Sequence, residues 1–78
     1  MRVKEERFVV TFHTTAEAMA AEKAFQKAEI PGRLIPVPRQ ISAGCGLAWS
    51  GPALQEEETK AFMDAEGLGW EERGIYRI

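Results

Sequence analysis

Residues 7–29 read RFVVTFHTTAEAMAAEKAFQKAE, and this stretch decides the fold because a strand pattern passes directly into a helix pattern. Residues 7–13 are rich in β-branched and aromatic side chains, which favour a strand. Alternate side chains of a strand share a face. The predicted strand therefore has one face with Phe8, Val10 and Phe12 and another with Val9, Thr11 and His13.

A helix is predicted over residues 16–29, where alanines and other good helix formers follow one another. Thr14 and Glu17 fit a capping box, in which each side chain binds a backbone N–H at the helix start. Ile30, Pro31 and Gly32 end the helix. Its expected apolar face, with small side chains that allow close approach to a sheet, consists of Ala18, Ala21, Phe25 and Ala28.

The rest of the chain predicts two more strands, a second helix and a last strand. Two strands are expected at residues 33–38 and 45–50, joined by a connection at 39–44. The last strand is expected within residues 70–78, and its strand pattern is clearest at 74–78. The second helix opens at residues 50–52 and stops at Gly67 or Gly69. Its expected apolar face consists of Leu54, Ala61, Phe62 and Ala65.

This β-α-β-β-α-β order is typical of the ferredoxin-like α+β fold, a four-stranded antiparallel sheet with two helices on one face. The first and third strands are then central. Pro36 agrees with this arrangement, because proline has no N–H for a sheet ladder and belongs on an edge strand. The fold by itself does not indicate a function.

Length and composition exclude several classes of protein. The 78 residues predict one domain over 1–78, and one Cys and one His supply neither an intrachain disulfide nor a four-ligand zinc site. We therefore expect no structural zinc site, and a chain of this size lacks the volume expected for the pocket of a stand-alone enzyme. A net charge of −2 argues against a nucleic-acid binder, and no apolar run reaches the ~20 residues that span a bilayer. Without a signal-peptide pattern the expected location is cytoplasmic.

The candidate site is Cys45, which lies between Gly44 and Gly46. Two flanking glycines uncover the thiol and allow positive φ angles. Because the first and third strands are antiparallel neighbours, the end of the first strand at His13 should lie beside Cys45, close to the start of the first helix. The connection should bring Arg39 back to this same end. A helix N-terminus and cationic neighbours favour the thiolate over the thiol.

Other interpretations of Cys45 stay open. A lone Cys can be a small buried hydrophobic residue, or a redox sensor that takes up oxygen or glutathione. The chain can also be an interaction module with an inert Cys, in which Val9, Thr11 and Trp49 form an apolar patch on the uncovered sheet face and a homodimer interface. A metal site shared by Cys45 and His13 of two chains is a further alternative.

Two blocks resemble the selenium/sulfur carrier protein-like family of small bacterial and archaeal domains. The first is residues 18–25, AMAAEKAF, followed by Ile30-Pro31 and by residues 34–39, LIPVPR, and the second is residues 41–48, ISAGCGLA. The resemblance implies that Cys45 takes up sulfur or selenium as a persulfide or selenosulfide. It also implies two partners, a donor enzyme of the cysteine desulfurase type and an acceptor enzyme. Such a carrier needs no metal or cofactor, because thiol exchange requires only an accessible thiolate.

Overall fold

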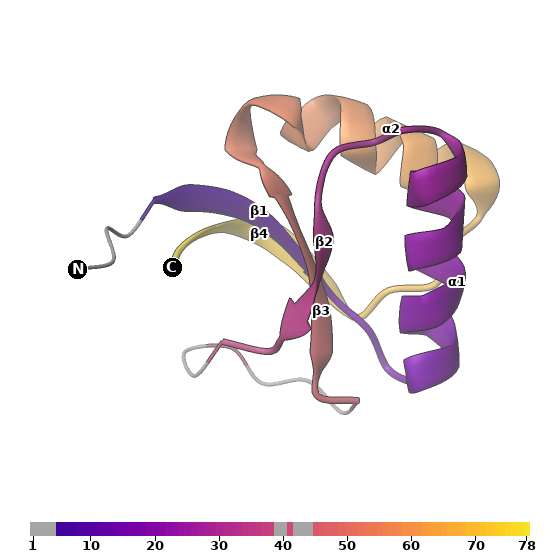
Figure 1. Ribbon diagram of the computed structural model, residues 1–78, viewed down its shortest axis with the longest axis horizontal. Helices are drawn as coiled ribbons and strands as arrows, with labels where there is room; N and C mark the ends of the chain where they lie inside the picture. The colour runs from indigo at the N-terminus through magenta and orange to yellow at the C-terminus, as the bar shows by residue number, and fades with distance from the viewer. Residues whose placement is uncertain (1–4, 39–40, 42–44) are drawn as a thin grey trace.

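The computed structural model describes residues 5–38, 41 and 45–78. A four-stranded sheet has the order β2-β3-β1-β4, and all three neighbouring pairs are antiparallel (Figure 1). The predicted ferredoxin-like α+β fold is confirmed, with β1 and β3 in the centre and Pro36 on the edge strand β2. The elements in chain order are β1 (Glu6–Thr11), α1 (Thr15–Lys27), β2 (Arg33–Pro36), β3 (Leu47–Pro52), a 3₁₀ turn η1 (Ala53–Gln55), α2 (Glu56–Glu66) and β4 (Glu72–Arg77).

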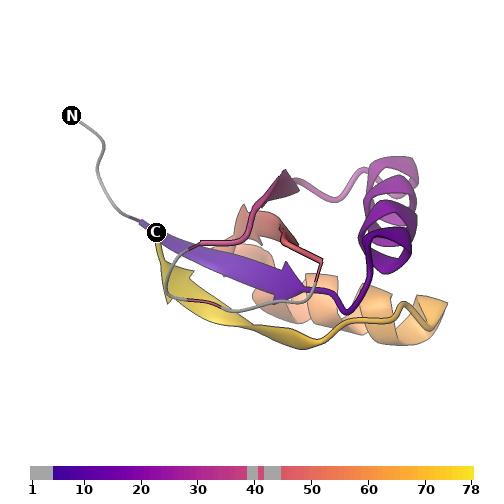
Figure 2. The ribbon, with the colours of Figure 1, turned by 90° about the horizontal axis from the view of Figure 1, so that it is seen from below.

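Both helices lie on one side of the sheet, and the larger core lies between them and the strands (Figure 2). Phe25 of α1 packs against Trp49 of β3 with their ring centroids 4.6 Å apart. The shared face of Phe8, Val10 and Phe12 is confirmed, as is that of Ala18, Ala21 and Phe25. The fully enclosed members of this helix-side core are Phe8, Val10, Phe12, Ala18, Ala21, Phe25, Trp49 and Met63.

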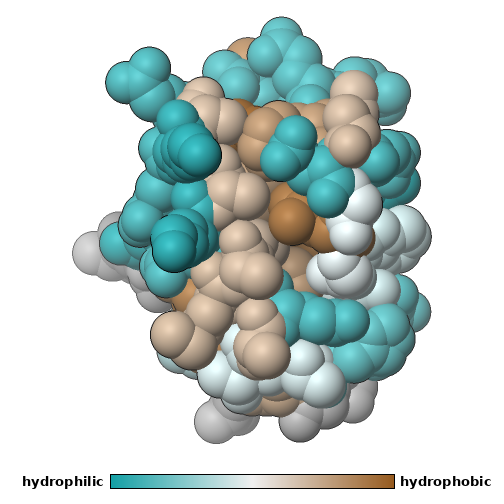
Figure 3. Space-filling view, turned by 90° about the vertical axis from the view of Figure 1, so that its right-hand side faces the viewer, coloured by the Kyte–Doolittle hydropathy of each residue, from teal (hydrophilic) through white to brown (hydrophobic). Residues whose placement is uncertain are grey.

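The outer surface of α1 follows from its alanine-rich sequence. Ala16, Met19 and Ala20 are exposed, and Met19 keeps 60% of its accessible area. Figure 3 shows this side of the molecule, where a pale apolar band runs between hydrophilic flanks. Ala28 is also exposed, so its predicted place on the buried face is wrong, because α1 ends at Lys27 and Ala28 is the C-cap. No helix in the described part of the chain is long and apolar enough to cross a bilayer.

The predicted buried face of the second helix is largely wrong. Leu54 is 99% exposed, and Ala61 and Ala65 are exposed as well, whereas Phe62 is partly buried. Thr59 and Met63 are the residues that α2 buries. The reason is the 3₁₀ turn η1, which places Leu54 before the α-helix and shifts the phase of the helical repeat.

The two helices end in the same way on different residues. In both, an amide bonds back to the carbonyl five residues earlier in the chain: Ile30 N to Phe25 O at 2.9 Å, and Leu68 N to Met63 O at 3.1 Å. The left-handed position between is Gly67 in α2, with φ 65°, which confirms one of the two predicted stops. In α1 this position is Glu29, with φ 60°.

The other sheet face has a second, smaller core of Val9, Ile41 and Ala48. Trp49 lies opposite Val10 in the β1–β3 pairing, so it shares the helix-side face. The predicted exposed patch of Val9, Thr11 and Trp49 is therefore wrong, since these residues divide between the two faces and each is at most 1% exposed. The homodimer stays a prediction, but these residues do not form its surface.

Candidate functional site

Cys45 lies just before β3, at the end of the sheet where β1 passes into α1. The last β1–β3 pair is Thr11 with Ala48, and the N-cap of α1 is Thr14. Antiparallel pairing thus puts the start of β3 and the start of α1 at the same end of the molecule (Figure 1). Cys45 is half-buried and packs against the edge of the helix-side core.

The Cys45 sulfur contacts the backbone of Leu47 in two ways. Its Sγ lies 3.4 Å from the Leu47 N–H, which donates to it, and 3.4 Å from the Leu47 carbonyl, which accepts from the thiol. These two backbone contacts fix the position of the sulfur beside the start of β3.

Gly46 gives the thiol an open side. Its φ of 76° lies in the left-handed region, where a residue with a Cβ is strained. A Cβ at this position would have no heavy atom of the described chain within 4 Å, and Gly46 is exposed. The Gly46 carbonyl accepts a hydrogen bond from the Val37 N–H at 3.0 Å, which ties this segment to the end of β2.

His13 turns toward Glu17 at the start of α1. Its Nδ1 lies 3.1 Å from Glu17 Oε1, and its side chain is 59% exposed. The same carboxylate oxygen accepts the His13 backbone N–H at 2.8 Å, while Thr14 Oγ1 accepts the Glu17 N–H at 3.1 Å. The capping box is present, with Glu17 reaching the amide of His13 where a standard capping box uses that of Thr14.

These contacts set the electrostatics at the start of α1. The His13 backbone N–H, followed by the His13 side chain, holds the pKa of Glu17 below its ordinary value. A carboxylate thus stands beside the imidazole and the first turn of α1, and its negative charge offsets both. Sequence reasoning recognised Glu17 as a capping residue but missed this second role, which the same capping pattern at 14–17 could have signalled.

Two of the predicted site residues are not described by the structure. Arg39 and Gly44 lie outside the described residues, so their expected place near Cys45 stays a prediction. Among residues 5–38, 41 and 45–78 no three His, Cys, Asp or Glu side chains converge as metal ligands would. The described site is a half-exposed thiol held by the Leu47 backbone beside an open glycine.

A comparison with known protein families gives one match. Residues 7–77 match the family described as "Putative Se/S carrier protein-like". The match extends from β1 through β4, and so covers both the Gly-Cys-Gly segment and the second helix. No curated protein and no solved structure matches this chain significantly. The description of the family names a carrier of selenium or sulfur, a role that involves a donor and an acceptor.

Proposed function

Because this chain belongs to the Se/S carrier protein-like family, we propose that it carries sulfur or selenium on the thiol of Cys45. The observation that supports this role is the position of Cys45, which is not fully buried and lies beside the exposed Gly46. Cys45 is the only cysteine in the sequence, so no second thiol can resolve a loaded Cys45 within the chain.

The chemistry is thiol exchange without a net change of oxidation state. The Cys45 thiolate attacks the outer sulfur of a donor persulfide, R–S–SH. A new S–S bond forms on Cys45 as the donor S–S bond breaks, and the donor thiolate leaves with the electron pair and takes a proton from water. An acceptor nucleophile then attacks the terminal sulfur, and Cys45 leaves as the thiolate.

The environment of the sulfur suits both half-reactions. The Leu47 N–H can donate to the Cys45 thiolate before attack and again when Cys45 is the leaving group. We infer two partners, a donor enzyme of the cysteine desulfurase type and an acceptor enzyme, and a cytoplasmic setting in which a thiol stays reduced. The small size of the chain leaves Cys45 near a surface that both enzymes can reach.

The test is the intact mass of the protein after incubation with a persulfide donor. We expect a gain of about 32 Da for one sulfur, lost again on treatment with a reducing thiol. Cys45→Ser should gain nothing and keep its circular dichroism spectrum, because Cys45 lies at the edge of the core. His13→Gln is the matched control and should load normally, since the imidazole contacts Glu17.

Three outcomes would contradict the proposal. One is a wild-type protein whose mass does not change with the persulfide donor. Another is a Cys45→Ser variant that still gains sulfur. A third is protein that gains only oxygen or glutathione when donor and oxidant are offered together, which would identify a redox sensor.

A further inference from the structure

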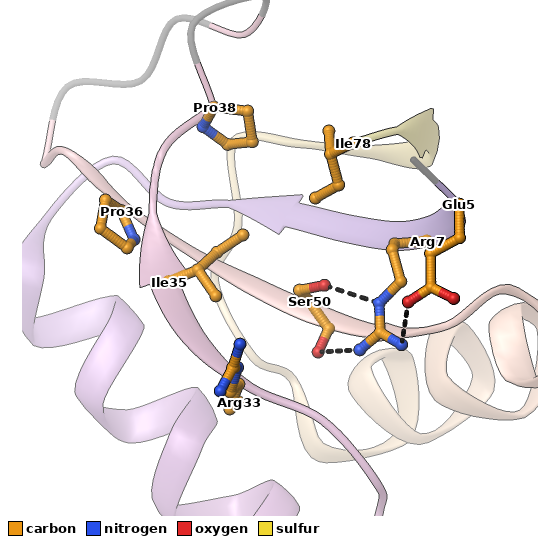
Figure 4. Close-up of a pocket in the computed structure, with 8 residues that line it drawn as sticks. All are labelled: Glu5, Arg7, Arg33, Ile35, Pro36, Pro38, Ser50 and Ile78. Atoms are coloured by element: carbon orange, nitrogen blue, oxygen red, sulfur yellow. Dashed lines mark hydrogen bonds and ion pairs between the residues drawn. The ribbon is translucent and has the colours of Figure 1, made fainter. Parts of the chain in front are cut away.

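A pocket lies on the sheet face that the helices leave free, away from Cys45. It encloses about 510 Å³ and opens to solvent. Ser50 and its neighbours across the sheet, Arg33 of β2 and Val9 of β1, share this face by register. Cys45, in contrast, packs against the core on the helix side. The residues that line the pocket are Glu5, Arg7, Arg33, Ile35, Pro36, Pro38, Ser50 and Ile78 (Figure 4).

Two arginines flank Ser50 from neighbouring strands. Arg7 is fixed: its Nε donates to Ser50 Oγ at 3.0 Å, and its Nη2 donates to the Ser50 carbonyl at 3.4 Å. Its Nη1 lies 3.6 Å from Glu5 Oε1, but Glu5 is 69% exposed and the pair is screened by solvent. Figure 4 shows Ser50 between Arg7 and Arg33.

Arg33 has no hydrogen-bond or ion-pair partner among the residues that the structure describes, although its Cα is paired with that of Ser50. Two guanidinium groups on one side of a pocket repel each other, and the one carboxylate side chain among the described lining residues, that of Glu5, pairs with Arg7 alone. An anion bound between them would remove this repulsion. The planar fork of arginine is well suited to the paired oxygens of a carboxylate or phosphate.

The opposite wall of the pocket is apolar. Ile35 lies in β2, Pro38 lies two residues after the end of β2, and Ile78 follows β4 directly. We propose that this pocket binds a small organic anion, whose carboxylate or phosphate pairs with Arg33 and Arg7 and whose apolar part lies against these side chains. Small-molecule sites commonly combine an apolar lining with a few converging polar groups. This site is independent of the thiol chemistry proposed for Cys45.

The test is a titration of the full-length ¹⁵N-labelled protein with four probes, followed by amide chemical shifts. Phenyl phosphate and benzoate carry both an anion and an apolar ring, inorganic phosphate lacks the ring, and benzyl alcohol lacks the charge. We expect saturable shifts at Arg33, Ile35 and Ser50 with the first two probes. Phosphate should bind more weakly and benzyl alcohol should leave these shifts unchanged. The tighter of the two anionic ring probes identifies the preferred acid group.

Arg33→Gln should weaken binding of the better probe about tenfold or more, because a charge-assisted hydrogen bond is lost. Arg33 is exposed on an edge strand, so this variant should fold normally. The affinity of Arg33→Lys should lie between those of wild type and Arg33→Gln, since lysine keeps the charge but lacks the planar guanidinium group. Lys23→Gln on α1 removes the same charge far from the pocket and should bind as wild type. Cys45→Ser should also bind as wild type.

The proposal is overturned by any of three results. The first is that the anionic probes leave the pocket amides unchanged while shifting other residues. The second is that Lys23→Gln weakens binding as much as Arg33→Gln, which would mean nonspecific attraction to positive charge. The third is that benzyl alcohol binds as well as benzoate, which would mean a purely apolar site. None of these results would bear on sulfur loading at Cys45.

Discussion

The two faces of the sheet are built in different ways. The helix-side core contains four aromatic side chains, Phe8, Phe12, Phe25 and Trp49, and regular helices cover it. The core on the other face consists of Val9, Ile41 and Ala48, and Ile41 comes from the connection between β2 and β3. The helix-side core buries more apolar side chains and so contributes more of the free energy of folding. The second face carries the arginine pocket.

The difference extends to the backbone. Most amides of α1 and α2 bond within their own helix. In the described part of the β2–β3 connection, Val37 N donates to Gly46 O and Ile41 N donates to Pro38 O. Cys45 follows this connection directly, and the Val37–Gly46 hydrogen bond attaches the segment beside it to the end of β2.

The largest expected effect tests the helix-side core. Phe25 is fully buried and contacts both Trp49 and Phe62, with ring centroids 4.6 Å and 5.7 Å apart. Phe25→Ala should lower the free energy of unfolding by about 3–5 kcal/mol. A domain of this size has about that much to lose, so the variant should be mostly unfolded. Urea denaturation followed by circular dichroism measures the change.

Ile41→Ala is the matched variant on the other face. Ile41 is 7% exposed in the smaller core, so its loss should lie near the lower end for such changes, about 2 kcal/mol. The protein should stay folded, while iodoacetamide should modify Cys45 faster because the connection is less firmly attached. Equal losses of stability in the two variants would show that the two faces contribute alike, against the comparison drawn above.

A smaller effect is expected at the C-terminal end of α1, where Glu29 occupies the left-handed position that α2 gives to Gly67. A residue with a Cβ pays about 1 kcal/mol in this conformation. Glu29→Gly should therefore raise the free energy of unfolding by up to about 1 kcal/mol without changing the reactivity of Cys45.

The reverse change at α2 provides the control for Glu29→Gly. A Cβ at Gly67 would meet no atom within 4 Å, so Gly67→Ala should lose about 1 kcal/mol through backbone strain alone. Urea denaturation of both variants measures the pair. If Glu29→Gly destabilises the protein, side-chain contacts of Glu29 outweigh the strain at its backbone.

The sequence was sufficient to predict the topology because its local strand and helix patterns agreed with the strand order of the ferredoxin-like fold. Alternating residues in 7–13 and the capping box at Thr14 and Glu17 set the first strand and helix, and Pro36 identified an edge strand. The second helix shows where local reasoning ends. Apolar residues alone suggested Leu54 and Ala61 for its buried face, but the 3₁₀ turn after β3 set the phase, and Thr59 is buried instead.

The site was predictable in position more than in detail. The Gly-Cys-Gly pattern and the antiparallel pairing of β1 with β3 indicated where Cys45 would lie, relative to the start of α1. Two features depended on side-chain geometry that a sequence does not contain: the Leu47 contacts to the sulfur and the turn of His13 toward Glu17. The arginine pocket was missed because Arg7 and Arg33 are distant in sequence and meet only through the register at Ser50.

The smallest expected effect concerns Glu17, which lies in the first turn of α1. Its pKa is lowered from an ordinary value of 4.5, first by the His13 backbone N–H and then by the His13 side chain. Folding therefore favours its carboxylate form. The resulting stabilisation is complete above 4.5 and is lost as the pH falls through the lower pKa of the folded protein.

Glu17→Gln isolates this contribution, because glutamine keeps an oxygen that can accept the His13 N–H and removes only the charge. We expect the urea midpoints of wild type and variant to differ at about pH 6 and to converge as the pH falls through the lowered pKa of Glu17 in the folded protein. Added salt should reduce the difference at the higher pH, since the group is exposed to solvent. Parallel curves over this range would mean that the charge of Glu17 contributes nothing, and that only its hydrogen bonds hold the start of α1 beside Cys45.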